Sequence, residues 1–540
     1  MHGDGIVHYR GGRVFTSDER RPWAESVVTD GELIRFVGPA AEADRIPGIA
    51  RTVDLDGALV LPGLVEAHSH LVNLGRSLEQ VDLFDARDLE DVQRRLAEAA
   101  ASRPAAARIL GRSWLLGPLA GREPDRAMLD AAVPDRPVYL TSNDLHSGWV
   151  NSAALAELGI DRDTPDPAGG TIVRDAHGEA TGLLLETAAL VLMRGGIERL
   201  EDDSVRDAAV GRALERYLAA GVTAVADLGL RDAEFAALDR ARERDALPIP
   251  VTGYLRVERS GTRAAELAQV ERAIAIRSRV AAHGSPMLRV AGVKIWIDGV
   301  IDSGTAAMRE PFGDGSRPEA LWSRDALEAV VVAADAAGLQ VAMHAIGDAA
   351  VELGIDAVEA ALRANGDHGV RHRLEHLEVV APESLARLAR LGITASVQPV
   401  HADPAVQQAW RERLGDARSG QGYPWAELDR AGVHLALGTD APTAPYAPLP
   451  NLFIAATRSS ASDAALPANH PEQALTLARA IIAATRGAAE ACGWTDRGVL
   501  APGLRADFVL LDRDPFEDGP EALRDAAPAG LVIGGIQRIP

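Results

Sequence analysis

The stretch "RVAGVKIWIDG", residues 289 to 299, has the Val and Ile content of a buried strand and ends in Asp-Gly. Similar Val/Ile/Leu-rich stretches recur along the chain, and most are followed by Ala/Leu/Arg/Glu segments with helical spacing. The eight stretches span residues 57–70, 221–229, 249–257, 289–299, 339–348, 370–379, 392–399 and 432–442. This alternation is typical of strand–helix units around a parallel sheet, and eight units predict an α/β fold, a (β/α)8 TIM barrel.

Lys294, in the fourth of these stretches, is the only lysine in a chain with 56 Lys and Arg residues. Abundant Arg, Ala and Gly with almost no Lys is typical of a GC-rich coding bias. That bias explains the absence of lysine elsewhere but not its retention at this position. In a (β/α)8 barrel the reactive side chains lie at the C-terminal ends of the strands, and Lys294 lies close to such an end.

Histidines follow other predicted strands. His68 and His70 of "EAHSH" are two residues apart, so strand geometry places both rings on one face. Two imidazoles on one face can chelate a cation, although an isolated His-x-His is more often accidental. His344 in "VAMHAIGD" and His376 in "RHRLEH" close two further strands, and Asp440 in "LGTDAP" closes the eighth. Four histidines and a carboxylate at one rim predict a metal site.

A protonated Lys294 facing cations would be repelled, so its amine must be neutral or chemically altered there. A neutral amine can take up carbon dioxide to give a carbamate, an anion that can bridge two metals. Arginine cannot do so, because its guanidinium does not deprotonate in proteins. The alternative is an unmodified lysine, buried or on the surface, that escaped replacement.

These residues stand in motifs that resemble the amidohydrolase superfamily, and within it amidohydrolase family 3, the group that includes N-substituted formamide deformylases. The resemblance runs from about residue 60 to residue 512. Its motifs are "LPGLVEAHSH", "LHSGWVNSAAL", "GVKIWIDG", "MHAIGD", "RHRLEH", "SVQPVH", "LALGTDAP" and "GVLAPGLRADFVLLD". One departure is "DGVIDSGTA", where Gly304 replaces an arginine common in the family.

The resemblance implies a two-metal site, usually zinc, with a carboxylated lysine as bridging ligand. The implied ligands are His68, His70 and Asp440 on the more buried ion, His344 and His376 on the other, and Lys294 between them. Two cations can lower the pKa of a shared water to near neutrality, so a hydroxide is the expected nucleophile. Asp440 would take up the proton and deliver it to the leaving nitrogen.

Further side chains are expected near the substrate. The resemblance implies that His146 and His401 face it as catalytic groups or polar contacts, the alternative being ordinary surface histidines. Trp296 and Asp298 are candidate substrate contacts, although Trp296 also fits a barrel-filling role. Arg373 and Glu375 flank His376 and are expected to point away from the metals, in supporting or structural roles.

Three functions are compatible with this site. The main hypothesis is a binuclear metal hydrolase of a non-peptide carbon–nitrogen bond, such as an amide or formamide, in a small molecule. A lactone or ester hydrolase would use the same residues. A non-catalytic amidohydrolase-like scaffold is the third possibility, and the complete ligand set argues against it.

The barrel is assigned to residues 57–495, and two further parts flank or interrupt it. Residues 1–56 and 496–540 contain short strand-like runs and are expected to form one composite β-sandwich domain. Residues 71–220 separate the first two barrel strands by far more than a loop, and predict an inserted α+β subdomain covering the barrel mouth. This insertion contains its own strand, "RPVYLTSND".

The composition and charge of the chain limit the kinds of partner that we expect. A net charge of −22, spread along the chain, repels nucleic acid and anionic lipid, so a small-molecule substrate is expected and neither polymer nor membrane is. The single cysteine, Cys492, excludes an internal disulfide. No apolar run reaches the roughly 18 residues of a membrane span, and no basic start precedes an apolar core. We expect a cytoplasmic, soluble protein, and a homodimer is compatible with this architecture.

Overall fold

The computed structural model describes residues 5–142, 147–167 and 169–539. The chain forms two compact units. One comprises the residues up to Leu71 and from Val210 onward, and we call it the barrel unit. The other, Val72–Ala209, is the inserted unit. In the described part of the chain, no helix combines the length and the apolar character that crossing a bilayer requires.

The centre of the barrel unit is an eight-stranded parallel sheet in which each strand pairs with the next along the chain. The strands are β6 (Leu64–Ser69), β13 (Val222–Leu230), β14 (Val251–Arg256), β15 (Leu288–Trp296), β16 (Gln340–Ala345), β17 (Arg373–His376), β18 (Thr394–Val397) and β19 (His434–Leu437). A parallel bridge between Ser69 and Ala441 connects the last strand to the first. The predicted eight-stranded parallel barrel is therefore confirmed.

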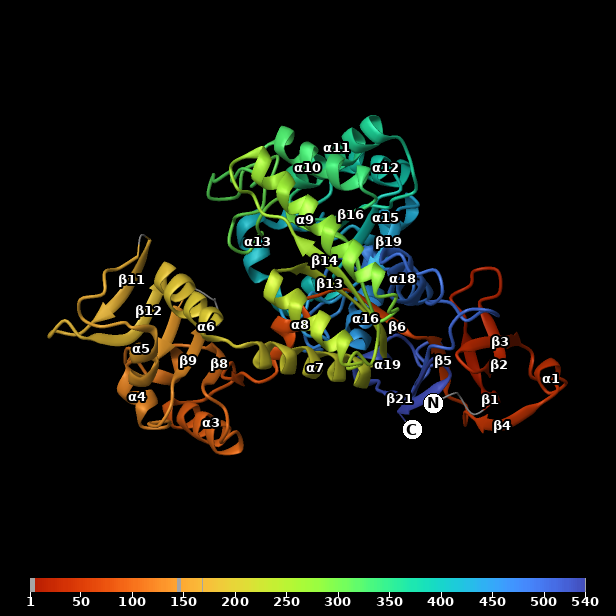
Figure 1. Cartoon of the computed structure of the whole chain (residues 1–540), viewed down its shortest axis with the longest axis horizontal. Helices are drawn as coiled ribbons and strands as arrows, with labels where there is room; N and C mark the ends of the chain where they lie inside the picture. The colour runs from red at the N-terminus through yellow and green to blue at the C-terminus, as the bar shows by residue number, and fades with distance from the viewer. Residues whose placement is uncertain (1–4, 143–146, 168, 540) are drawn as a thin grey trace. The chain divides into compact units, whose positions relative to one another are not determined.

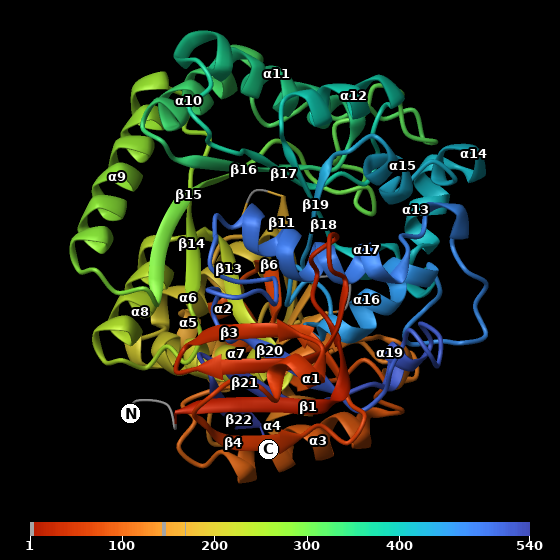
Figure 2. The same cartoon turned by 90° about the vertical axis from the view of Figure 1, so that its right-hand side faces the viewer.

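Helices follow the strands and pack on the outside of the sheet. Figure 2 shows α9 (Arg263–Ala282), α10 (Arg324–Ala336), α11 (Asp348–Asn365) and α12 (Pro382–Arg390) outside β15, β16 and β17. In α11 the buried residues include Val351, Ile355 and Val358, which recur at the spacing of one helical face. Helix α18 (Ala488–Ala491) belongs to the same buried cluster as Ala67, Ala224 and other residues of the strands.

The barrel unit contains further α-helices. They are α1 (Ala40–Ala43), α7 (Asp203–Ala219, which begins in the inserted unit), α8 (Asp232–Glu243), α13 (Gln408–Leu414), α14 (Asp416–Ser419), α15 (Trp425–Arg430), α16 (Pro448–Thr457), α17 (Leu477–Ile482) and α19 (Ala522–Asp525). Helix α2 (Leu71–Ser77) contains the boundary between the two units.

Strands from both ends of the chain share a second sheet of the barrel unit. Its order is β22-β21-β20-β5-β1-β2-β3, with β4 paired to β1. The strands are β1 (Ile6–Phe15), β2 (Trp23–Asp30), β3 (Leu33–Gly38), β4 (Ile49–Asp54), β5 (Leu59–Pro62), β20 (Phe508–Leu511), β21 (Pro528–Ile533) and β22 (Ile536–Ile539). We call it the terminal sheet.

The first predicted barrel strand, residues 57–70, contains two strands. Its first half, β5, pairs with β1 and β20 in the terminal sheet, and only its second half, β6, enters the barrel. Gly63 separates them and donates its N–H to the carbonyl of Asp507 at 2.9 Å. A Cβ at Gly63 would lie 2.3 Å from Thr223 Oγ1, so a larger residue would not fit this crossing. The barrel strand thus begins at Leu64, not at residue 57.

The inserted unit, orange to yellow in Figure 1, has a six-stranded sheet in the order β11-β12-β10-β9-β8-β7. Its strands are β7 (Val81–Asp82), β8 (Ile109–Trp114), β9 (Val138–Ser142), β10 (Ser147–Val150), β11 (Gly170–Arg174) and β12 (Ala180–Glu186). Its helices include α3 (Leu89–Ser102), α4 (Arg126–Asp130), α5 (Ser152–Leu158) and α6 (Gly195–Leu200). Strand β9 is the one predicted from "RPVYLTSND", and two hydrophobic clusters form the core of this unit.

Candidate active site

The predicted metal ligands lie at one end of the barrel, in or just beyond the C-terminal halves of their strands. They are His68 in β6, His70 directly after it, Lys294 in β15, His344 in β16, His376 at the end of β17 and Asp440 after β19. Because parallel strands share this edge, residues separated by hundreds of positions in the sequence meet here.

Asp440 is the point on which two of the imidazoles converge. Its Oδ1 lies 3.0 Å from His70 Nε2 and 3.3 Å from His68 Nε2. The backbone φ of Asp440 is 58°, in the left-handed region that few non-glycine residues adopt, and such strain is common at functional sites. Neighbouring imidazoles hold the pKa of this carboxyl well below its usual range although burial opposes ionisation. Asp440 is therefore an anion at neutral pH.

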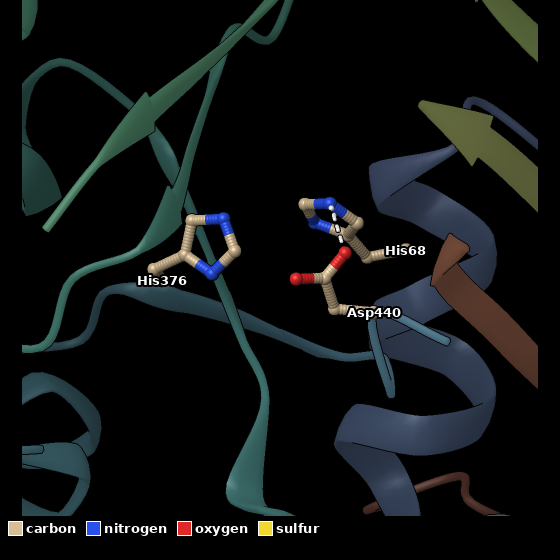
Figure 3. A group of neighbouring side chains, drawn as sticks. All are labelled: His68, His376 and Asp440. Carbon is tan, nitrogen blue, oxygen red and sulfur yellow. Dashed lines mark ion pairs between the residues drawn. The ribbon is translucent and has the colours of Figure 1, made fainter. Parts of the chain in front are cut away.

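His376 approaches this pair from β17. Figure 3 shows its ring on one side and the His68–Asp440 ion pair on the other. The ring centroid of His376 lies 5.0 Å from that of His68 and 4.4 Å from that of His344. One potential ligand atom from each of His68, His376 and Asp440 lies within 4.8 Å of the others. Burial and the neighbouring His344 lower the pKa of His376 well below its usual value, so its ring is neutral, as a metal ligand must be.

Carboxylates fix the orientation of two of these rings. His68 Nδ1 lies 2.8 Å from Glu375 Oε2, and His344 Nδ1 lies 3.0 Å from Asp298 Oδ1. Each contact leaves Nε2 for another partner, an arrangement typical of metal-binding histidines. Asp298 also accepts three backbone N–H groups, those of Ala307, Ile346 and Gly347. Asp298, a predicted substrate contact, is 2% exposed and holds His344 in place.

The expectation that Arg373 and Glu375 point away from the site is wrong. Both are fully buried, and Arg373 donates to Glu375 through Nε at 2.7 Å and Nη2 at 3.0 Å. The same Nη2 also donates to the carbonyl of Ala67 at 2.8 Å. Strand alternation puts both side chains inside the barrel, whereas His376 has a φ of 77° and turns back toward them. Arg373 and His68 hold the pKa of Glu375 well below its usual range, although burial opposes this.

Lys294 is fully buried beside these residues. Its Nζ has no hydrogen-bond partner among the described residues and lies 5.2 Å from the ring centroid of Trp296. Burial lowers the pKa of Lys294 from 10.5 to about 8, although the carboxylates of Glu375 and Asp440 oppose the shift. The partly exposed Trp296 also contacts Arg256, whose Cζ lies 4.7 Å from the ring centroid. The amine of Lys294 therefore loses its proton more readily than that of an ordinary lysine.

His401 lies at the edge of the site. Its ring stacks on that of His376, with centroids 5.7 Å apart and an interplanar angle of 8°. His401 Nε2 lies 3.8 Å from Asp440 Oδ2, and Nδ1 lies 3.5 Å from Glu378 Oε1. Although burial opposes protonation, Glu378 and Asp440 raise the pKa of His401. His146, the other predicted substrate contact, lies outside the described residues.

Sequence reasoning missed two carboxylates of the site. Glu378 receives the indole N–H of Trp410 at 3.1 Å and forms, with His376 and His401, a second group able to hold a cation. Glu66 accepts the backbone N–H of His68 at 2.8 Å, and burial raises its pKa to about 7. Each carboxylate stands two residues from a predicted ligand, and this spacing is the signal that could have identified them.

The donor set fits divalent cations. Imidazole nitrogens and carboxylate oxygens are ligands that zinc prefers. In addition, His376 Nδ1 and Lys294 Nζ are buried polar atoms without a hydrogen-bond partner in the described part of the chain. Buried polar atoms are normally paired, so these two atoms indicate that a further group belongs in this site.

Comparisons with known proteins agree with this chemistry. The sequence profile of the amidohydrolase family matches residues 51–537. The protein LONG AFTER FAR-RED 3 of Arabidopsis thaliana is 32% identical over 98% of this chain and 91% of its own length. The N-substituted formamide deformylase of Arthrobacter pascens is 29% identical, over 97% and 96% of the two chains.

A solved structure is similar over the same extent. It is an uncharacterized metal-dependent hydrolase from Pyrococcus horikoshii, with a TM-score of 0.78 and 26% identity, and the similarity covers 99% of this chain and 100% of that one. The profile match, the relatives and the barrel with its histidines and carboxylates lead to one conclusion. This chain belongs to the amidohydrolase family.

Proposed function

We propose that the protein is a metal-dependent hydrolase that cleaves a non-peptide carbon–nitrogen bond, such as an amide or formamide, in a small molecule. The observation that carries this proposal is the meeting of His68, His376 and Asp440, with ligand atoms within 4.8 Å, beside a buried lysine amine. The formamide deformylase among the relatives supports a carbon–nitrogen bond as the target.

Two divalent cations, zinc in our proposal, would be held by His68, His70, His344, His376, Asp440 and a carboxylated Lys294. When bound, such ions lower the pKa of water to near neutrality and polarise a carbonyl group. The carbamate forms when the neutral amine of Lys294 bonds to the carbon of CO2 and loses a proton to solvent. The lowered pKa of Lys294 supports this step, because the neutral amine is the reactive form.

Asp440 carries the proton in this proposal. It is ionised because His68 and His70 stabilise its negative charge, so it can accept a proton from the attacking water. The protonated carboxyl then delivers the proton to the leaving nitrogen, and the products are a carboxylic acid and an amine. His401, held by Glu378 and facing Asp440, would contact the polar end of the substrate. We assign His146 and Trp296 to further substrate contacts.

The test is elemental analysis of the purified protein together with a hydrolysis screen. The screen pairs each amide or formamide with the ester of the same acid, so that only the leaving atom differs within a pair. We expect about two metal ions per chain and amide or formamide hydrolysis that a chelator abolishes and zinc restores. If the protein hydrolyses only the esters, its target is an ester bond and not a carbon–nitrogen bond. A metal-free protein whose properties do not change on chelation would contradict the proposal and favour a scaffold.

A further inference from the structure

A second candidate site lies at the opposite end of the barrel. A cleft of about 490 Å³ lies at the N-terminal ends of β15, β16 and β17, away from the predicted metal ligands. The residues that matter for its chemistry are Arg277, Arg289, Arg371, Gln340, Glu490 and Trp494. The proposed reaction uses none of them.

The cleft concentrates positive charge in a chain whose net charge is −22. Arg277 donates to the backbone carbonyls of residues 337 and 338, at 2.7 and 2.9 Å. Arg289 donates to Thr252 Oγ1 at 3.0 Å and to the carbonyl of Gly493 at 2.9 Å. All of these acceptors are neutral, so they satisfy N–H groups without cancelling the charge of either guanidinium.

Arg371 adds a third guanidinium at the rim, with 43% of its side chain exposed. Its Nη1 lies 4.0 Å from Glu490 Oε2, at the limit of an ion pair. That same carboxylate oxygen lies 3.0 Å from His434 Nε2. Glu490 is the one carboxylate among the described lining residues, and it therefore leaves an excess of positive charge in the cleft.

Arg289 presents an unused donor in a fixed position. Its Nη2 is buried and has no hydrogen-bond partner among the described residues. Its guanidinium lies over Trp494, with Cζ 3.8 Å from the ring centroid, and Arg497 lies 4.5 Å from the same ring. Arg497 is paired with Asp496, at 3.1 and 3.2 Å, so the nearby carboxylate already has a partner. Burial also lowers the pKa of Arg289, which a bound anion would oppose.

We propose that this cleft binds a small oxyanion, with carboxylate or phosphate oxygens accepting N–H groups from Arg289 and Arg371. Guanidinium groups match both kinds of oxyanion in geometry, and charge-assisted hydrogen bonds of this type are among the stronger ones in proteins. The cleft is large enough to hold an organic molecule that carries such a group. The proposal does not depend on the reaction at the other end of the barrel.

The test is calorimetric titration of the full-length protein with phosphate and, separately, with succinate, at constant ionic strength. The variants are Arg371→Gln and Arg289→Gln. Arg20→Gln, on the exposed turn between β1 and β2 of the terminal sheet, is a control that removes the same charge. The metal ligands are unchanged in all three variants, so any anion binding at the metal site contributes equally to each titration.

We expect the unmodified protein and Arg20→Gln to bind with the same affinity. Each cleft variant should bind at least roughly tenfold more weakly, as expected for lost charged hydrogen bonds. Binding of phosphate alone or of succinate alone supports the site and identifies the anionic group. The proposal is overturned if neither anion binds with a dissociation constant below about 10 mM. It is also overturned if both cleft variants bind with the same affinity as the unmodified protein. Arg371→Gln keeps the test valid if Arg289→Gln fails to fold, because the Arg371 side chain is partly exposed.

Discussion

Replacing Lys294 by arginine is the sharpest test of the proposed metal centre. The substitution keeps a long basic side chain but removes the amine that carbon dioxide can modify. At pH 7, a pKa of about 8 leaves about one amine in ten neutral, against roughly one in 3,000 at the ordinary value of 10.5. An arginine at this position would have no neutral fraction, because its guanidinium stays protonated. We therefore expect Lys294→Arg to fold but to lose the proposed bridging ligand.

The expected loss is large. Replacing groups that only support a metal ligand costs about 10- to 100-fold in metal affinity or activity. Removing the proposed bridging ligand should cost more than about 100-fold in turnover, with loss of one or both ions. The assays are metal content by elemental analysis and turnover on the best substrate of the screen. Circular dichroism checks that the barrel still forms.

Two further variants separate the amine from its charge. Lys294→Met is neutral and has no amine, so it should be as inactive as Lys294→Arg. Lys294→Ala leaves space at this position, and added propionate should restore part of its activity by supplying a carboxylate. The metal-free unmodified protein should regain activity with zinc only when carbon dioxide is present. Turnover and two bound ions in Lys294→Arg would refute the reasoning.

Three other perturbations have expected outcomes. Glu375→Gln leaves Arg373 buried without its carboxylate partner. Thermal unfolding of the metal-free protein should therefore show a free energy of unfolding that is lower by about 3–5 kcal/mol. Zinc competition with a chelator should also show roughly 10- to 100-fold weaker binding, because His68 loses the negatively charged partner of its Nδ1. Asp440→Asn should lower turnover by about 100- to 10,000-fold in the screen, and a loss below tenfold would exclude it as the proton carrier. For Lys294 the folded pKa is lowered from 10.5 to about 8, so the unfolded state binds more protons between these pH values and stability rises with pH across that window. Denaturant unfolding of the metal-free protein should show a gain of up to about 3 kcal/mol from pH 8 to 10.5, relative to Lys294→Met, which lacks the titrating amine.

The barrel could be predicted because a parallel sheet covered on both faces has near-continuous apolar strands, and eight such runs are present. The division of residues 57–70 into two strands of different sheets could not be predicted. Strands β5 and β6 are separated by one residue, and both begin with an apolar pair and are buried along their whole length, so the sequence reads as one continuous strand. Their assignment to different sheets depends on a hydrogen bond from Gly63 to Asp507, a partner more than 400 positions away.

The candidate site was also predicted only in part. The histidines could be predicted because each closes a strand, and strand ends of a barrel meet. The supporting roles of Arg373 and Glu375 were also expected, but the direction of their side chains could not be predicted, because strand alternation relates them to His376 only if the backbone continues as a strand. Alternation places Arg373 and Glu375 inside the barrel, and the left-handed φ of His376 breaks the alternation, so that His376 also lies on the interior side. A positive φ at histidine is uncommon, and no sequence pattern indicates it here.

The polar residues at the closing seam of the barrel connect folding to the site. Glu66 of β6 accepts the backbone N–H groups of His68 and Thr439 and the Thr439 hydroxyl, at 2.8, 3.0 and 2.8 Å. It therefore joins the first strand to the segment after the last one, where Asp440 follows directly. Inside the barrel, Arg373 donates to a carbonyl of β6 and to the carboxylate that orients His68. The contacts that close the barrel are thus the same contacts that position His68 and Asp440, so the ligand pair can form only when the first and last strands have met.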